Sequence, residues 1–329
     1  MKVTLRWLAT PFALAAVLTL AACGSDSSAD SDDDSASATG DSSAYPVTIE
    51  TSFGSVEIEE KPERVVTIGF NGQDFALALG VEPVGVREFL GYDAVNRPWA
   101  PDSVRGKQIP TVGAEELDVE KVATLDPDLI LGLNSYIDEQ TYELLSDIAP
   151  TVAEPDNAAP NWEEQTLTTG KALGVEDEAK DLVKETEQSF ADARKEHPEF
   201  EGKSAGFALG GGYSLGTDDY RVGWLTDLAF TLPKKGGEVS AEKLEVFDKD
   251  VLIAEGVESE VADSAVFQSL DVVQQNRMVD VGSFSDDFAG ALGFNSPLSL
   301  PYVLEVAVPR LAAATDDDPS TKPAPYPQD

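Results

Sequence analysis

Two residue types that often form metal sites and active sites are almost missing from this sequence, which has one histidine, His197, and one cysteine, Cys23. A single cysteine excludes an intramolecular disulfide. Zinc and manganese sites usually draw on histidine or cysteine, so we expect no protein site for either ion. Bare ferric iron stays open, because Tyr213 and Tyr220 could bind it together with carboxylates. Tyrosines in such loops more often contact an organic ligand.

Basic residues are also scarce, since 23 Lys and Arg stand against 61 Asp and Glu and give a net charge of −38. Such a chain repels nucleic-acid phosphate and anionic lipid headgroups. We therefore expect no nucleic-acid partner and a well-solvated surface. The hydrophobic share of 42% is enough for a large core, and 329 residues allow two domains of ordinary size.

The first 22 residues have the pattern of a secretory signal peptide, with a positively charged start before an apolar run from Leu8 to Ala22. The run is too short to cross a bilayer comfortably, because a spanning helix needs about 20 apolar residues. It ends in Leu20-Ala21-Ala22-Cys23, which resembles the bacterial lipobox, where signal peptidase cuts before a cysteine that carries diacylglycerol. We expect lipidated Cys23 to anchor the protein to the outer face of the cell membrane.

Two segments have the composition of disordered chain. Apart from Cys23, residues 23–44 contain no apolar side chain larger than alanine. They therefore cannot bury enough surface to offset the entropy of ordering. We expect them to form a flexible acidic tether. Residues 314–329 are rich in Asp and Pro, and we expect a disordered tail there too.

The longest helical pattern lies near the middle of the chain, over residues 175–198 with its ends included. Its apolar residues recur at steps of three and four and form one stripe, while charged residues fill the opposite face. Pro198 ends the helix, because its ring disfavours the α conformation at His197. At about 1.5 Å per residue the helix is roughly 30 Å long, the width of a small domain. It is predicted to join two lobes, residues 45–174 and 199–313.

Strand and helix patterns alternate on both sides of this helix. After a hairpin over Pro46–Ile58, the first lobe has predicted strands at Arg64–Gly69, Val84–Val86 and Asp128–Leu133 and helices at Phe75–Leu79, Val119–Leu125 and Thr141–Ile148. The second lobe has predicted strands at Ser204–Leu209, Asp250–Ala254 and Met278–Val281 and helices at Trp224–Phe230, Ala241–Phe247 and Leu298–Leu311. The alternation predicts an α/β fold with a mainly parallel sheet in each Rossmann-like lobe. A ligand would then bind at the carboxyl ends of the strands.

One motif suggests an enzyme. Gly212-Tyr213-Ser214-Leu215-Gly216 fits the G-x-S-x-G nucleophile elbow of serine hydrolases and follows a predicted strand. The order of the triad then fails, because histidine should follow the serine and His197 precedes Ser214. A hydrolase that uses Ser214 is a distant alternative, and the glycines favour a flexible loop beside a ligand.

Six short pieces match one family in order and in register, from about Tyr45 to Leu311. They are Lys61–Val66, Leu79–Val86, Leu117–Lys121, Leu125–Ile130, Ile148–Val152 and Pro297–Tyr302. These pieces resemble the ferric-siderophore-binding lipoproteins of ABC importers. The resemblance implies a monomeric binding protein with a helical spine and small lobe movements, no enzymatic activity and no cofactor. It would capture a ferric siderophore between its lobes and deliver it to a permease and its ATPase. The same fold group serves haem, cobalamin and some metal ions, so these ligands and ferric iron stay open.

The resemblance also implies which residues touch the ligand. In the family's hydroxamate binders an arginine in the loop after the second strand and a tyrosine after the next strand contact the siderophore, and the matching positions here are Arg97 and Tyr136. Other candidates lie in predicted loops or near them, and a place in the core is the alternative for each aromatic one: Arg87, Trp99, Tyr213, Tyr220, Arg221, Trp224, Phe284, Phe288 and Phe294. Arginine would give charge-assisted hydrogen bonds to oxygens around iron. A tris-catecholate complex is strongly anionic, so the acidic composition favours a neutral or cationic hydroxamate.

Permease docking is expected at one glutamate on each lobe. In the family such glutamates pair with arginines on the permease, and the matching positions are Glu120 and Glu242. Each opens a predicted helix after a candidate cap, Asp118 or Ser240. The alternative is that each only complements the helix dipole, a contribution of about 0.3–1 kcal/mol.

Overall fold

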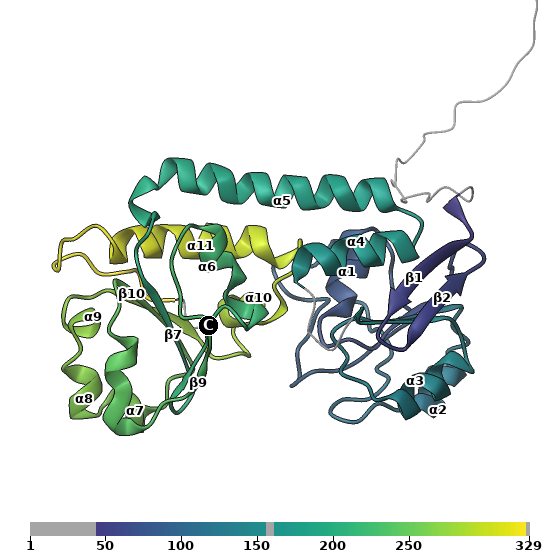
Figure 1. Cartoon of the computed structure of the whole chain (residues 1–329), viewed down its shortest axis with the longest axis horizontal. Helices are drawn as coiled ribbons and strands as arrows, with labels where there is room; N and C mark the ends of the chain where they lie inside the picture. Colours follow the sequence, from purple (N-terminus) through teal and green to yellow (C-terminus); the bar gives the residue numbers. More distant parts are fainter. Residues whose placement is uncertain (1–43, 156–160, 327–329) are drawn as a thin grey trace, which may run out of the picture. The chain divides into compact units, whose positions relative to one another are not determined.

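The computed structural model describes residues 44–155 and 161–326, which belong to one compact unit. This part of the chain consists of two α/β lobes, and the long helix α5 (Glu176–Glu196) runs along both (Figure 1). The predicted α/β class with two lobes and one long connecting helix is confirmed. The expected signal peptide, Cys23 and nearly all of the expected tether lie outside the described residues.

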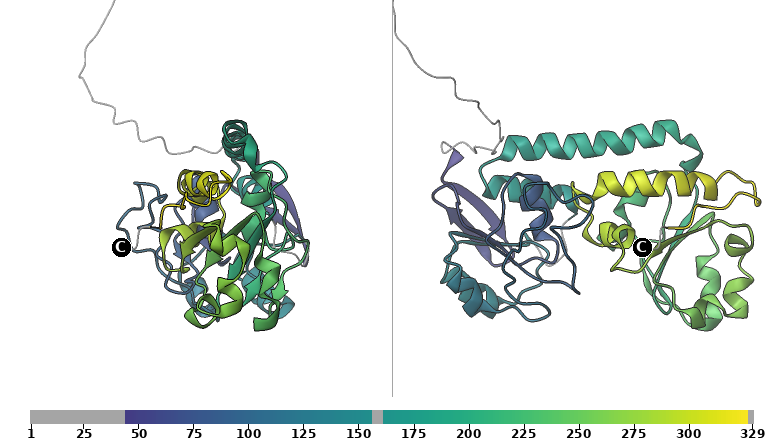
Figure 2. Two further views of the ribbon diagram at one scale, coloured as in Figure 1. Left: turned by 90° about the vertical axis from the view of Figure 1, so that its left-hand side faces the viewer. Right: turned by 180° about the vertical axis from the view of Figure 1, so that it is seen from behind.

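The N-terminal lobe contains a wholly parallel sheet of four strands. Its order is β4 (Gly85–Val86), β3 (Val65–Thr67), β5 (Leu129–Gly132) and β6 (Thr151–Ala153). Helices cover both faces, as a parallel sheet requires. The helices α1 (Gly72–Ala78) and α4 (Trp162–Ala172) lie toward α5, and α2 (Val119–Thr124) and α3 (Glu139–Ser146) lie on the other side (Figures 1 and 2).

The predicted hairpin precedes this sheet as β1 (Val47–Thr51) and β2 (Gly54–Ile58), paired antiparallel. Every second side chain is buried in both strands, which explains the alternating sequence pattern. Gly54 has φ of 119°, a conformation that favours glycine, and it begins the second strand.

The C-terminal lobe contains a sheet with the expected parallel core and two short antiparallel strands at one edge. Three strands are parallel, in the order β11 (Met278–Gly282), β10 (Val251–Glu255) and β7 (Ala205–Leu209). The short strands β8 (Tyr213–Ser214) and β9 (Gly237–Glu238) extend the β7 edge in antiparallel pairs. The surrounding helices are η2 (Pro198–Phe200), η3 (Tyr220–Val222), α6 (Gly223–Asp227), η4 (Ala241–Phe247), α7 (Ser259–Ala262), α8 (Ala265–Gln268), α9 (Asp271–Gln274), α10 (Asp287–Phe294) and α11 (Ser299–Ala314).

Helix α5 contributes to the hydrophobic cores of both lobes. Ala179, near its start, is buried in a cluster with Ile49 and Leu129 of the N-terminal lobe. Phe190, near its end, is buried with Phe207 and other core residues of the C-terminal lobe. The apolar stripe found in the sequence is therefore shared between two cores, and the opposite face is exposed.

Several elements of the structure differ from those expected. The sequence patterns predict no element at the positions of strand β6 and helix α4, because polar and small residues there obscure any apolar period. The segment Gly282–Ser296, expected to be a loop, contains α10, which is buried from Phe288 to Phe294 and so lacks an amphipathic pattern. The predicted helix at Ala241–Phe247 is a 3₁₀ helix with a kink at Lys243.

The C-terminal tail, expected to be disordered, packs back on the C-terminal lobe up to Tyr326. Arg310 of α11 donates hydrogen bonds from Nε and Nη2 to the carbonyls of Ala324 and Pro325, each at 3.1 Å. The Tyr326 hydroxyl accepts a bond from the Phe288 amide at 2.9 Å, and the two rings are 5.5 Å apart. One aromatic anchor orders a segment whose composition alone favours disorder.

Candidate functional site

A cavity of about 550 Å³ lies between the two lobes, at the carboxyl ends of their strands. Leu209 and Glu255 are the last residues of β7 and β10, and Phe89 and Tyr136 follow β4 and β5 by a few residues. This is where the alternation of strands and helices predicts a ligand crevice. We call this cavity the cleft, and its lining residues are Phe89, Leu90, Tyr136, Leu209, Asp218, Asp219, Tyr220, Arg221, Glu255, Phe284 and Gly293.

A second cavity of about 670 Å³ borders the cleft on the N-terminal lobe. Residues 86–89, 91–96 and 106–111 line it together with Gln73 and Phe294. Phe89 faces both cavities. The long loop after β4 therefore forms walls of two neighbouring hollows, which agrees with the functional role expected for a long loop at this edge.

Tyr136 projects into the cleft from the N-terminal lobe and is 61% exposed. Its backbone has φ of 53°, and the buried Glu154 carboxylate holds this turn in place. Glu154 Oε1 accepts hydrogen bonds from the amides of Ser135 at 2.6 Å and Tyr136 at 3.2 Å. The turn therefore presents an aromatic ring with little support from other side chains, as a ligand wall would need.

Aromatic rings join the two lobes at the cleft. Phe89 of the N-terminal lobe meets Phe284 of the C-terminal lobe edge to face, with ring centroids 5.4 Å apart. Tyr92 stacks on Phe294 at 3.7 Å. Gly293 lines the cleft next to Phe284, and a Cβ there would collide with the ring of Phe284. This position therefore requires glycine for the rings to pack.

Arg87 supports the loops and leaves no free guanidinium face toward the cleft. It is buried and donates hydrogen bonds to the carbonyls of Ala114, Glu115 and Ser135 at 2.8, 2.7 and 3.2 Å. Its guanidinium carbon lies 4.2 Å from the Phe70 ring centroid. Arg87 lines the second cavity and does not line the cleft.

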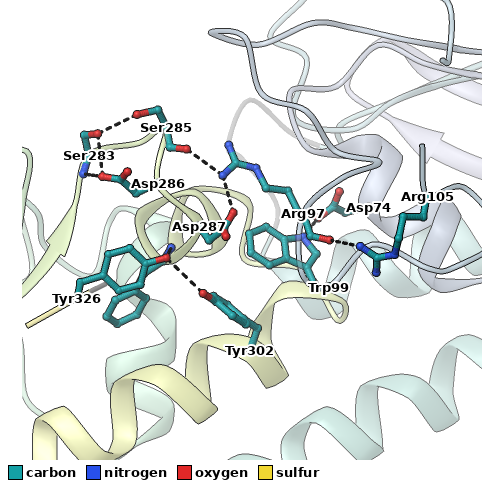
Figure 3. A network of polar contacts seen from close by, with 11 residues as sticks. Asp74, Arg97, Trp99, Arg105, Ser283, Ser285, Asp286, Asp287, Tyr302 and Tyr326 are labelled. Atoms are coloured by element: carbon teal, nitrogen blue, oxygen red, sulfur yellow. Dashed lines mark hydrogen bonds and ion pairs between the residues drawn. The ribbon is translucent and has the colours of Figure 1, made fainter. Parts of the chain in front are cut away.

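Arg97 and Trp99, both expected to contact a ligand, instead link the lobes (Figure 3). Arg97 Nη1 donates to Ser285 O and to Asp287 Oδ1, each at 2.9 Å. Trp99 Nε1 donates to the buried carboxylate of Asp74 at 3.3 Å, and Ser296 Oγ of the C-terminal lobe donates to the same oxygen at 3.1 Å. Neither Arg97 nor Trp99 lines the cleft.

The pKa of Asp74 lies far above its ordinary value because of this burial. Burial raises it to about 7, while the bonds from Ser296 and Trp99 oppose the rise. A titrating carboxyl therefore sits in the contact between the lobes.

The wall on the C-terminal side is charged. Arg221 holds Asp219 by two parallel bonds, Nε to Oδ1 at 2.9 Å and Nη2 to Oδ2 at 2.8 Å. Burial favours a higher pKa for Asp219, but the bonds from Arg221 outweigh it and hold the pKa below its ordinary value. Glu255 is only 4% exposed, and burial raises its pKa to about 7 against the nearby charge of Arg221.

The remaining aromatic candidates separate into cleft residues and core residues. Tyr220 lines the cleft, and its hydroxyl donates to Gly293 O at 3.0 Å. Trp224 and Phe288 are fully buried in the core of the C-terminal lobe, so their rings cannot form the cleft surface. Tyr213 is exposed on β8 and lines another hollow of about 510 Å³, together with Lys243.

Sequence reasoning missed Phe89, Leu90, Leu209 and Glu255. A signal for Glu255 was present, since it directly follows the apolar strand Val251–Ala254 at its carboxyl end. Phe89 and Leu90 lie between the expected Arg87 and Arg97, and the choice among residues of a long loop needs the folded loop itself. The exposed, positive-φ conformation of Leu90 is one example of what the sequence does not display.

The distant alternative of a hydrolase that uses Ser214 gains no support from the structure. The nucleophile elbow needs a strand, a tight turn and a helix, whereas Ser214 lies in β8 and pairs antiparallel with β7. Ser214 Oγ donates to Gly237 O at 3.2 Å. His197, the C-cap of α5, pairs through Nδ1 with Glu199 at 2.8 Å, and its ring stacks on Phe200.

Glu120 and Glu242 are both exposed on short helices, α2 and η4. Asp118 caps α2 as expected, because its carboxylate accepts a bond from the Lys121 amide at 3.0 Å. Ser240 makes no side-chain cap bond within the described residues.

Two features are absent from residues 44–155 and 161–326. This part of the chain contains no group of three or more His, Cys, Asp or Glu that could hold a metal ion, and no helix long and apolar enough to cross a membrane.

The chain is similar to known binding proteins in sequence and in structure. Residues 73–283 match the family model described as periplasmic binding protein. A probable siderophore-binding lipoprotein of Bacillus subtilis is 30% identical over 243 residues, which cover 71% of this chain and 70% of that protein. An iron(3+)-hydroxamate-binding protein of the same organism is 30% identical over 190 residues, or 58% of this chain and 54% of the relative.

Solved structures of binding proteins have the same fold as this chain. A periplasmic solute-binding protein from Mycobacterium smegmatis superposes with a TM-score of 0.73 at 31% identity, over 82% of this chain and 99% of the other. The Streptococcus pneumoniae protein PiaA in complex with ferrichrome superposes with a TM-score of 0.69 at 26% identity, over 83% and 99%.

Proposed function

Because this chain belongs to the periplasmic binding protein family, we propose that it captures a ferric siderophore in the cleft and delivers it to an ABC importer. The observation that carries the proposal is the cleft itself, which has aromatic walls from both lobes and lies at the strand ends. Its volume of about 550 Å³ lies within the range of small-molecule sites. A siderophore fills the iron shell with its own oxygens, so the protein needs only walls and a few polar anchors.

A hydroxamate is the favoured siderophore class. The charged residues in the cleft are Asp218, Asp219 and Glu255 against Arg221 alone, and Arg221 is already paired. Acidic walls repel a strongly anionic tris-catecholate complex and tolerate a neutral or cationic hydroxamate complex. The hydroxamate-binding relative and the ferrichrome-bound neighbour support the same choice.

Tyr136, Tyr220, Phe89 and Phe284 are the residues that we propose to contact the siderophore, with Arg221 and its partner Asp219 as polar anchors. Arg97 and Arg87 serve the ligand indirectly, since each holds a loop that borders the cleft. The direct binding of bare ferric iron by Tyr213 and Tyr220 gains no support, because the two side chains line different hollows.

Delivery requires an anchored protein and a docking surface. We propose that lipidated Cys23 holds the protein at the outer face of the membrane, as a lipoprotein relative would be held. Glu120 and Glu242 would pair with permease arginines, one from each lobe. Both lie on exposed helical turns, and no ion pair within residues 44–155 and 161–326 involves either carboxylate.

Quenching of tryptophan fluorescence tests the proposal. The purified protein is titrated with a ferric trihydroxamate, a ferric tris-catecholate, haem and cobalamin. We expect saturable quenching at micromolar concentration or below with the trihydroxamate, about 100-fold tighter than with the tris-catecholate. Saturable binding of haem or cobalamin, with none of either ferric siderophore, would overturn the proposal in favour of another ligand of this fold.

A further inference from the structure

Glu255 carries a buried carboxylate oxygen that lacks a hydrogen-bond partner. The residue ends β10 and lines the cleft, and it is 4% exposed. Its Oε2 has no partner among residues 44–155 and 161–326. A buried polar atom without a partner costs free energy in the folded protein, so this oxygen in the wall of a ligand cavity is available for a bond from the ligand.

The nearest base does not fill this role. Arg221 uses Nε and Nη2 to hold both carboxylate oxygens of Asp219. It lies close enough to Glu255 to act on it through space, but no hydrogen bond joins the two in the described structure. The charge of Arg221 is thus largely neutralised by Asp219, and the carboxylate of Glu255 remains available to a ligand.

The other titratable groups that face the cleft also leave Glu255 without a donor. The Tyr220 hydroxyl is bonded to Gly293 O. Tyr136 belongs to the opposite wall, on the N-terminal lobe, and Asp218 is a second acid. With Arg221 paired to Asp219, the remaining charge on this wall is negative.

We propose that Glu255 is the subsite for a protonated amine on the ferric siderophore, so that the cleft selects cationic, amine-bearing complexes over neutral ones of the same iron-binding part. The inference rests on the proposed siderophore function and adds the chemical class within it. An ammonium group offers three donors and a positive charge, and it matches a carboxylate acceptor. An uncharged siderophore leaves Oε2 unpaired and gains nothing from the acidic wall.

A different role for Glu255 makes a different prediction. If the carboxyl is protonated and donates a hydrogen bond to an oxygen near iron, the amine is irrelevant. Both an amine-bearing complex and its acetylated form would then bind equally. A matched pair of ligands therefore separates the two roles.

The experiment compares a linear ferric trihydroxamate that ends in a free amine with the same complex after N-acetylation. Affinities are measured by calorimetry at about pH 8, where the carboxylate is charged. We expect the amine form to bind the unmodified protein about tenfold or more tightly than the acetylated form, as a charged hydrogen bond implies. In Glu255→Gln the two affinities should agree within about twofold, because the charge is gone.

Controls keep folding and function apart from the subsite. Glu260→Gln removes an exposed charge from α7 on the same lobe and should leave the tenfold preference unchanged. The acetylated ligand reports whether the Glu255→Gln cleft is intact, since its affinity should not fall. If Glu255→Gln does not fold, a measurement on the unmodified protein still tests the amine subsite. Calorimetry near pH 6.5 in two buffers should detect proton release with the amine ligand alone, because the bound ammonium favours ionised Glu255.

The possible outcomes are distinct. Equal affinity for the two ligands, or a preference that survives in Glu255→Gln, overturns the amine subsite and leaves the siderophore function standing. Failure of both ligands to bind, together with binding of haem or cobalamin, overturns the proposed function and the subsite with it.

Discussion

Arg97 of the N-terminal lobe and Asp287 of the C-terminal lobe form an ion pair, with Arg97 Nη1 2.9 Å from Asp287 Oδ1. The pair joins the long loop after β4 to the first residue of α10 (Figure 3). Asn71 adds a bond from its side-chain amide to Phe294 O at 2.8 Å. The lobes are therefore connected by direct contacts as well as by α5, which supports the expectation of small lobe movements on binding.

The first prediction concerns the strength of this pair. Both side chains are mostly buried, 11% and 28% exposed, so the interaction should exceed that of a surface ion pair. We expect a coupling free energy of about 1–2 kcal/mol in a double-mutant cycle of Arg97→Met and Asp287→Asn, measured by denaturant unfolding. Coupling near zero, together with a large loss of siderophore affinity in Arg97→Met, would instead return Arg97 to the ligand-contacting role implied by the family.

The sequence predicts elements whose patterns are local. The stripe along α5 has the period of a helix, and the uninterrupted apolar run Val251–Ala254 is typical of a parallel strand that is buried on both faces. The position of the cleft follows as well, because parallel strands with helical crossovers place their carboxyl ends at one edge. The fold class and the neighbourhood of the site could therefore be predicted without coordinates.

Which side chains line the cleft could not be predicted from the sequence. Arg97 and Tyr136 are equally plausible in the sequence, but one pairs with Asp287, 190 positions away in the chain, and the other faces the cleft. Trp224 lies only three positions after Arg221, which is partly exposed in the cleft, and Trp224 is fully buried. Which side of a short helix packs inward depends on contacts between residues far apart in the sequence. Helix α6 has five residues, too few for a hydrophobic period that would identify its buried side.

The second prediction concerns Tyr136. Replacing it with alanine should weaken ferric trihydroxamate binding about 5- to 20-fold, because an aromatic contact of about 1–2 kcal/mol is lost. The free energy of unfolding should change by less than about 0.5 kcal/mol, since the ring is exposed. Fluorescence titration and denaturant unfolding measure the two effects. Leu144→Ala removes another exposed hydrophobic side chain, from α3 outside the cleft, and should leave the affinity unchanged.

The third prediction concerns the pH dependence of stability through Asp74. Its pKa is raised from 3.8 to about 7 in the folded protein, so folding favours the protonated carboxyl. The stabilising contribution is complete below about pH 4 and is lost as the pH rises toward 7, at up to about 1.4 kcal/mol per pH unit. Asp74→Asn resembles the protonated form and lacks this dependence.

Denaturant unfolding between about pH 5 and pH 8 measures the effect. The free energy of unfolding of Asp74→Asn, relative to the unmodified protein, should rise with pH. Asp102→Asn, which changes an exposed aspartate, is the matched control. A constant difference between Asp74→Asn and the unmodified protein over this range would contradict a titrating carboxyl between the lobes.

The fourth prediction concerns the tail. Tyr326→Phe removes the hydroxyl that accepts a bond from the Phe288 amide and should lower the free energy of unfolding by about 0.5–1.5 kcal/mol. Tyr142→Phe is the control, because its ring stacks on Phe53 and the same atom is removed from a partly buried position. Equal effects of the two substitutions would mean that the tail bond adds nothing to stability.

The last prediction separates delivery from capture. Glu120 lies on α2, on the side of the N-terminal lobe away from α5 (Figures 1 and 2), and Glu242 lies on η4, which packs against α8. Glu120→Ala with Glu242→Ala should reduce uptake of radioactive iron by about tenfold or more, because two charge pairs with the permease are lost. Siderophore affinity should stay within about twofold, since neither residue lines the cleft.

The matched control for this double variant is Glu178→Ala with Glu185→Ala, which removes two exposed charges from α5. It alters the net charge equally but leaves the proposed docking glutamates in place, so iron uptake should remain normal. A general effect of charge would reduce uptake in both double variants. Normal uptake with Glu120 and Glu242 both replaced would show that these glutamates only complement their helix dipoles, and the docking surface would have to lie elsewhere on the two lobes.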